Sequence, residues 1–216
     1  MFAVRDLLKI VKPTNTIYKE CVLAKHNITS FPSKKFTTTT KLEIAHTNLS
    51  SPTKTKGFYG ERYFMILVDD FSRMMWVAFL KEKSEAFYKL KIFKNRVENE
   101  SGMKIECLRL DRGGEFTSNE FNIFCEANGI KRQLSVPRTP EQNDIAERRN
   151  KLVTEATRSM LAKNDVSKMF WREAMNTTLY TLNRVQVRKD TNKTPYELWF
   201  GHSPIVKYFK IFGSKC

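Results

Sequence analysis

Two carboxylates and one amide are the side chains whose spacing could support metal-dependent chemistry. Asp111 follows an apolar segment, and Glu147 lies in Thr139–Asn150 with 35 residues between the two acids. Upstream, the strand-like segment Leu42–Leu49 carries Asn48. Three carboxylates around two Mg²⁺ or Mn²⁺ ions about 4 Å apart neutralise the attacking and leaving oxygens of a displacement at a phosphodiester. Two carboxylates and an amide hold such ions less well, so residue 48 decides whether this chemistry is available.

The local setting of each acid suits a metal ligand. Asp111 ends an expected strand, and the glycines Gly113 and Gly114 let the backbone turn and a substrate approach closely. Glu147 falls on an expected helix whose apolar residues share one face, while Glu147, Lys151 and Arg158 share the other. Taken alone, Glu147 and Lys151 would be an ordinary ion pair one helical turn apart, worth a few tenths of a kcal/mol.

The elements that must position these residues follow from hydrophobic periodicity. We expect strands at 42–49, 63–68, 74–80, 105–110 and 131–136, and helices at about 84–102, 117–129, 141–163 and 167–184. Ser84 is the expected N-cap of the first helix, and Thr117 and Glu120 form an expected capping box for the second. Three strands in succession, then strands reached through helices, predict an α/β fold with a mixed five-stranded sheet flanked by helices, in an RNase H-like order.

The charge distribution favours a nucleic-acid partner. The formal net charge is +15 at pH 7. Residues 1–47 carry eight basic and three acidic side chains, residues 48–137 carry 15 and 12, and residues 138–216 carry 15 and eight. A near-neutral middle between basic ends suits an acidic polymer that reaches the carboxylates from the flanks, although a solvated lysine-rich surface is the alternative. No run of about 18 apolar residues predicts a membrane span.

A resemblance to a known family rests on several stretches in the same order. The chain from about Cys21 to Cys216 resembles the integrase region of copia-type LTR retrotransposon Pol polyproteins. The matching stretches are Tyr63–Leu80, Asp111–Phe116, Thr139–Asn150, Phe170–Ala174, Leu182–Arg184 and Asn192–Trp199.

The resemblance implies a polynucleotidyl transferase that trims retroelement cDNA ends and joins them to target DNA. It implies an RNase H-like catalytic core at 41–163, a helical extension at 164–216, and a linker with the remnant of an upstream zinc-binding module at 1–40. By motif, Asp111 is the second acid and Glu147 the third, and together they would bind Mg²⁺ or Mn²⁺. The resemblance also implies self-association and a nuclear location. The expected DNA contacts are Arg112, Arg148, Arg149, Lys151 and Arg158.

Departures from the family pattern predict an impaired enzyme. Asn48 stands at the first-acid position, where a neutral amide is a weaker ligand for hard cations. Cys21 matches the last ligand of the upstream zinc module, but Tyr18 stands where its partner cysteine belongs, so no zinc is expected. The sequence therefore suggests a truncated, partly degenerate piece with weak or absent strand transfer. A non-catalytic nucleic-acid-binding relic is the alternative, and a plain nuclease of the same fold is the third.

Several other residues have two interpretations. His46 is expected either as a packed strand histidine or as an outer partner of the metal site. Lys131 and Arg132 open a strand and would either border the site or be solvated. The three tryptophans are expected in the core. Asp69 and Asp70 fall outside the triad and are expected to form a turn.

Overall fold

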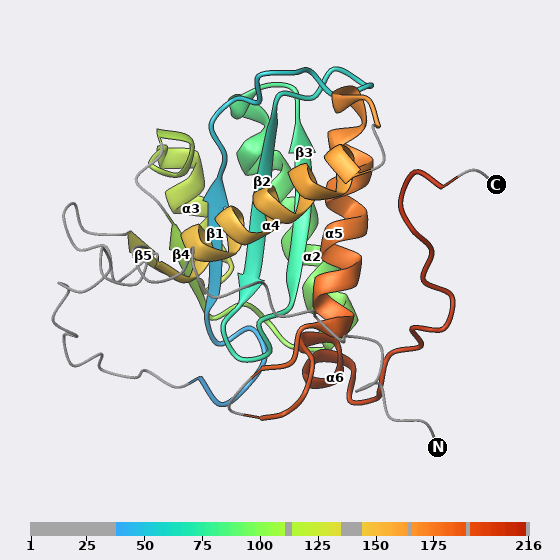
Figure 1. The fold of residues 1–216 in the computed structure, drawn as a ribbon. Coiled ribbons are helices and arrows are strands. Elements are labelled where there is room, and N and C mark those ends of the chain that lie inside the picture. Colours follow the sequence, from blue (N-terminus) through green and yellow to red (C-terminus); the bar gives the residue numbers. More distant parts are fainter. Residues whose placement is uncertain (1–37, 111–113, 135–143, 164–165, 189–190, 215–216) are drawn as a thin grey trace, which may run out of the picture. The chain divides into compact units, whose positions relative to one another are not determined.

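The computed structural model describes residues 38–110, 114–134, 144–163, 166–188 and 191–214, all within one compact unit (Figure 1). Its strands are β1 (Ala45–Leu49), β2 (Tyr63–Asp69), β3 (Met75–Leu80), β4 (Cys107–Leu110) and β5 (Lys131–Leu134). Its α-helices are α2 (Ala86–Ser101), α3 (Asn119–Ala127), α4 (Asp144–Lys163), α5 (Trp171–Val185) and α6 (Pro195–Phe200). Short 3₁₀ turns are η2 (Lys83–Glu85), η3 (Gly114–Phe116) and η4 (Lys168–Phe170).

The strands form the mixed five-stranded sheet that the sequence predicts. Their order is β3-β2-β1-β4-β5. β2 runs antiparallel to β1 and β3, whereas β4 is parallel to β1 and β5 is parallel to β4. β1 and β4 therefore end on the same side of the sheet, which we call the carboxyl end, and β2 begins there. The opposite side, where β4 and β5 begin, is the amino end.

Helices cover both faces of this sheet and build two apolar clusters. One cluster joins α2, α3 and α6 to one face, with Leu90, Phe121 and Trp199 among its buried residues. The other joins α4 and α5 to the opposite face, with Val153, Trp171 and others buried. Figure 1 shows α4 crossing the strands obliquely on this second face. The expectation that the tryptophans are core residues is confirmed, because Trp76, Trp171 and Trp199 are each at most 7% exposed.

Two expected helix starts are wrong for local reasons. Ser84 does not cap α2, because its hydroxyl donates to Glu82 within the 3₁₀ turn that precedes the helix. Ser118, not Thr117, caps α3, since the Ser118 hydroxyl accepts from the Phe121 N–H while the Thr117 hydroxyl donates back to the Gly114 carbonyl. At α3 the neighbouring Ser118 offers the same capping chemistry one position away, whereas Glu85 at the start of α2 makes no side-chain capping bond.

Further differences lie at element ends. The first strand begins at Ala45 rather than Leu42, because Leu42 has a positive φ and its N–H bonds the Asp69 carboxylate. Helix α6, which periodicity alone did not suggest, is fixed by a capping box between Thr194 and Glu197 with Pro195 at its first position. Among the helices of the described ranges, none combines the length and apolar character needed to cross a bilayer.

Candidate active site and its polar surroundings

Asn48 lies near the carboxyl end of β1, against helix α4. It pairs with Ile66 of β2, and its side chain is half-buried on the face that α4 covers. The Asn150 side-chain amide donates to the Asn48 Oδ1 at 2.8 Å. This contact joins residues 102 apart in the sequence, so it fixes the position of the helix over the central strand. The same amide oxygen of Asn48 is the atom that a metal ion would need.

Glu147 lies on the same helix, one turn before Asn150. Residues three apart in a helix share a face and are separated by about 4.5 Å along the axis. Glu147 therefore projects close to the carboxyl end of β1, and its side chain is exposed. That Asn48 and Glu147 form one site stays a prediction, which the contact between Asn150 and Asn48 supports.

Asp111 and Arg112 lie outside the described residues. The chain leaves β4 at Leu110, and β4 is the parallel neighbour of β1. Leu110 and Leu49 thus end neighbouring strands on the same side of the sheet. The predicted site positions therefore converge on the carboxyl end as far as the described residues extend. The predicted zinc-module residues Tyr18 and Cys21 also lie outside them.

The donor set in the described residues is short of what two divalent cations need. Glu147 supplies one exposed carboxylate, and Asn48 supplies a neutral oxygen that already accepts a hydrogen bond. Hard cations prefer several charged oxygens with room for water. Among the described residues, no group of three acidic, histidine or cysteine side chains could hold a metal ion. With its neutral oxygen, Asn48 is a weaker ligand for such cations than an aspartate would be.

The predicted DNA-contacting residues of α4 fall into two environments. Arg148, Lys151 and Arg158 are exposed on the outer surface of the helix. Arg149 is half-buried, and its guanidinium donates to the Gln186 side-chain oxygen at 2.6 Å. Burial lowers the pKa of Arg149, and the nearby charges of Arg73 and Arg188 lower it further. Periodicity alone would not distinguish Arg148 from Arg149, because the contact with Gln186 comes from a distant segment.

A second polar cluster lies under α4 at the amino end, where β2 turns into β3. Asp70 is 4% exposed and accepts hydrogen bonds from the Thr38 hydroxyl, the His46 Nε2–H and the Arg73 guanidinium, each at 2.8 Å. Burial works to raise the pKa of Asp70, but these donors and the charge of Arg73 bring it down to about 2. Asp70 is therefore an ionised, fully engaged carboxylate.

Its neighbours extend this hydrogen-bond network. Asp69 is completely buried and accepts from the Leu42 N–H and from both the N–H and the hydroxyl of Ser72. The expectation that Asp69 forms a turn is confirmed, whereas Asp70 also anchors His46. His46 is completely buried, which confirms a packed strand histidine. Burial lowers the pKa of His46 despite the hydrogen bond to Asp70, so the ring is neutral at neutral pH.

Lys131 and Arg132 border the opposite side of the sheet. They begin β5, which is parallel to β4, so they lie at the amino end. Both are exposed, and the Arg132 guanidinium bonds the Asn122 side chain. The prediction that they border the site is therefore wrong, and solvated charge is the better description.

Comparisons with known proteins agree with this geometry. The family described as integrase core domain matches residues 44–140. Residues 44–140 constitute an integrase core domain. This match includes β1 with Asn48 and extends through Asp111. The predicted integrase resemblance is thus confirmed.

Relatives in plants extend the similarity beyond the core domain. The chain is 34% identical over 195 residues to a retrovirus-related Pol polyprotein from transposon TNT 1-94 of Nicotiana tabacum. It is 30% identical over 212 residues to one from transposon RE2 of Arabidopsis thaliana. These alignments cover 90% and 97% of this chain but only 15% and 14% of the relatives. The chain therefore spans about one seventh of the length of those polyproteins.

Solved integrase structures share the fold. The catalytic core domain of HTLV-2 integrase in complex with magnesium superposes with a TM-score of 0.54 at 21% identity, covering 73% of this chain and 95% of that one. The integrase of a simian T-cell lymphotropic virus intasome gives a TM-score of 0.59 at 21% identity, covering 80% of this chain and 58% of that one. The RNase H-like fold that the sequence predicts is confirmed.

Proposed function

We propose that this chain is the DNA-binding core of a copia-type retroelement integrase whose metal-dependent strand transfer is impaired at position 48. The observation that carries the proposal is the hydrogen bond from the Asn150 side chain to the Asn48 Oδ1. This bond supports a single site between the end of β1 and α4, the helix that carries Glu147. It also supports the view that an amide pair stands where a metal ligand would be needed. The domain match and the plant relatives support the retroelement origin.

The proposed impairment has two causes: position 48 lacks a negative charge, and its oxygen already accepts a hydrogen bond. An aspartate at position 48 would bring one more negative charge and a second oxygen, whereas the amide brings neither. Because the Asn48 Oδ1 already accepts from Asn150, a metal ion would also have to compete with that donor. Asp111 and Glu147 are the side chains proposed to hold Mg²⁺ or Mn²⁺, and with two charges the affinity would be low.

DNA binding does not depend on that deficit. Arg148, Lys151 and Arg158 are exposed on α4, the helix that carries Glu147. Cations in this position can contact the phosphates of a duplex that lies across the carboxyl end of the sheet. We extend the proposal to Arg112 and Arg149, to retroelement cDNA ends and target DNA as the ligands, to self-association, and to a nuclear location. The domain division at residues 40 and 163 belongs to the same proposal.

The test compares this chain with Asn48→Asp in a Mn²⁺-dependent strand-transfer assay on a labelled duplex. We expect background activity from the unchanged chain and at least about 100-fold more from the variant, since even outer partners of metal ligands change activity by 10–100-fold. Asn48→Asp/Glu147→Gln is the control, because it restores the first acid and removes the third. Strand transfer well above background, equal with and without the aspartate, would contradict the impairment.

A second candidate is a nucleic-acid-binding relic without catalysis. The amide pair of Asn48 and Asn150 favours it, because the Asn150 side-chain N–H already occupies the Asn48 oxygen that a metal ion would need. Duplex binding by a chain in which Asn48→Asp restores no strand transfer would support this candidate.

A further inference from the structure

The loop between β1 and β2 presents exposed aromatic rings at the carboxyl end of the sheet. Phe58 and Tyr59 are 56% and 57% exposed, and Phe170 of η4 is 37% exposed. The rings of Phe58 and Phe170 stack with centroids 5.9 Å apart, and Tyr59 meets Phe58 edge-on at 5.1 Å. We call these three residues the aromatic tip. Large apolar side chains gathered on a surface mark a binding site more often than single exposed ones do.

The loop that carries the tip is held in one conformation. The Gly57 N–H bonds the Glu61 carbonyl, and the Phe58 N–H bonds the Met169 carbonyl of η4 at 3.0 Å. Gly60 has a φ of +91°, which favours glycine, and a Cβ at Gly57 would lie 2.7 Å from the Glu61 carboxylate, so the Glu61 side chain would have to move. A preordered loop loses little conformational entropy when a ligand binds.

Cationic residues adjoin the aromatic tip along the chain. Lys56 and Arg62 flank it in the sequence, and together with Lys81 they line a hollow of about 340 Å³. All three are exposed, and no described carboxylate pairs with them. The hollow also contains Lys83, which is 3.6 Å from Glu115, and the single acid Glu82. We call Lys56, Arg62 and Lys81 the cationic rim.

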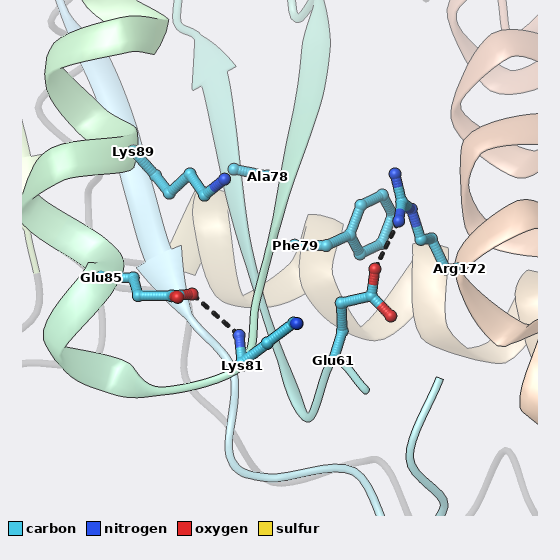
Figure 2. Close-up of a pocket in the computed structure, with 7 residues that line it drawn as sticks. All are labelled: Glu61, Ala78, Phe79, Lys81, Glu85, Lys89 and Arg172. Carbon is cyan, nitrogen blue, oxygen red and sulfur yellow. Dashed lines mark hydrogen bonds and ion pairs between the residues drawn. The ribbon is translucent and has the colours of Figure 1, made fainter. Parts of the chain in front are cut away.

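A neighbouring hollow of about 240 Å³ continues this surface and shares Lys81 with the first (Figure 2). Its acid Glu61 is already paired with Arg172, and Glu85 accepts from the Lys81 N–H. The Arg172 guanidinium also lies over the Tyr59 ring, 4.9 Å from its centroid. Each acid in this second hollow thus already has one partner, and neither of these partners is a side-chain ammonium or guanidinium of the cationic rim.

The surface lies within reach of the candidate active site. Asn48 pairs with Ile66, and Tyr63 at the start of β2 is three residues away, which is about 10 Å along a strand. Arg62 and Lys81 adjoin the Tyr63–Leu80 pair. At 3.4 Å per nucleotide, a strand leaving the site would cover this distance in about three nucleotides.

We propose that the aromatic tip and the cationic rim together bind a single-stranded segment of DNA, with bases stacked on the rings and phosphates held by the cations. A cationic groove beside exposed aromatic rings is the arrangement that binds unpaired nucleotides, because every base offers a flat face. In a duplex the bases are already stacked on one another, so the rings would gain little from it. The unpaired bases of single-stranded DNA can stack on these rings while its phosphates meet the cations. We therefore take single-stranded DNA, rather than an acidic protein, as the ligand. The inference rests on the proposed function in taking DNA as the polymer.

The test measures equilibrium binding of the full chain to a labelled oligo(dT) of about 12 nucleotides and to a duplex, by fluorescence anisotropy in EDTA. Phe58→Ala/Tyr59→Ala is expected to weaken oligo(dT) binding about tenfold or more and to leave duplex binding unchanged. Tyr88→Ala is the matched control, since Tyr88 is 64% exposed on α2. Phe58→Tyr/Tyr59→Trp keeps the rings and is expected to keep the affinity.

The cationic rim is tested by salt dependence. Arg62→Gln/Lys81→Gln is expected to reduce the slope of log K against log salt for oligo(dT) by about 1.4, which corresponds to two phosphate contacts. Lys104→Gln/Lys131→Gln makes the same charge change at the amino end of the sheet and is expected to leave the slope unchanged.

Three outcomes would overturn the inference: no binding of oligo(dT), equal losses for oligo(dT) and duplex in the alanine variant, or equal slopes in the two glutamine variants. The proposed function is tested separately by Asn48→Asp. Restored strand transfer in Asn48→Asp, together with any of these three outcomes, would contradict only the inference. The expected oligo(dT) results without restored strand transfer would contradict only the proposed function.

Discussion

Two polar groups lie toward opposite ends of β1 and differ in what occupies their oxygens. At the amino end, the Asp69 and Asp70 carboxylates are buried and accept bonds from five different residues. Toward the carboxyl end, Glu147 is exposed and Asn48 shares its oxygen with one donor. Of these described side chains, the two buried acids therefore have less capacity to bind a metal ion than the single exposed one.

The difference shows that the number of carboxylates does not by itself make a reactive site. A buried carboxylate is stable only when donors satisfy its oxygens, and those donors then exclude a cation. Asp69 and Asp70 tie the turn after β2 to the segment before β1 and to His46, so they stabilise the sheet. Glu147 is exposed to solvent, so its oxygens are hydrated without a donor from the described residues and stay available to a cation.

Removing a carboxylate from the buried group should have the largest effect on stability. Asp69→Ala would leave the Leu42 N–H and the Ser72 N–H and hydroxyl buried without an acceptor. We expect the free energy of unfolding to fall by about 3 kcal/mol or more, measured by urea denaturation with tryptophan fluorescence. A loss below about 1 kcal/mol would mean that water replaces the carboxylate and that the group is less closed than the hydrogen bonds indicate.

Protonation of His46 should give an intermediate effect that depends on pH. The folded pKa of His46 lies below its ordinary value of 6.5, because burial disfavours the charged ring. Below about pH 6.5 the unfolded chain binds a proton that the folded chain does not, so stability falls as the pH falls, by up to about 1.4 kcal/mol per pH unit. His46→Gln should lose this dependence. Parallel stability curves for the two proteins between pH 7.5 and 5 would contradict the assignment.

Removing the open carboxylate should have the smallest effect on stability. Glu147→Ala changes an exposed side chain, so we expect the free energy of unfolding to change by less than about 0.5 kcal/mol. In the Asn48→Asp background the same change should abolish Mn²⁺-dependent strand transfer. A large loss of stability would show that Glu147 has a structural partner and would remove the contrast with Asp69.

Part of the fold was accessible from local patterns. The apolar runs predicted β2 and β3 to within one residue, and the helical periodicity predicted α4 and α5 to within a few residues. Helix starts were less accessible, because Thr117 and Ser118 offer the same capping chemistry and α2 begins after a 3₁₀ turn without a side-chain cap. Which polar residue caps a helix depends on where the preceding loop leads the chain, and no local window contains that information.

The candidate site shows the same division. Glu147 was identified by its spacing and by the family resemblance, whereas Asn150 was missed as the partner of Asn48. The signal was present, since Asn150 lies one helical turn after Glu147, but its target is 102 residues away in the sequence. The aromatic tip was also missed, because exposed rings in a loop look like core residues until burial is known.

The sequence by itself determined the family, the order of strands and helices, and the absence of an acid at position 48. These properties reside in residue identity and in periodicities of two and 3.6 residues, which a single segment expresses. Only the tertiary structure decided which polar atoms are satisfied: it gave Asp69 and Asp70 their donors, turned Arg149 toward Gln186, and placed Asn150 against Asn48. Each of these depends on contacts between distant segments, and such contacts form only when the apolar faces of the sheet and helices pack together.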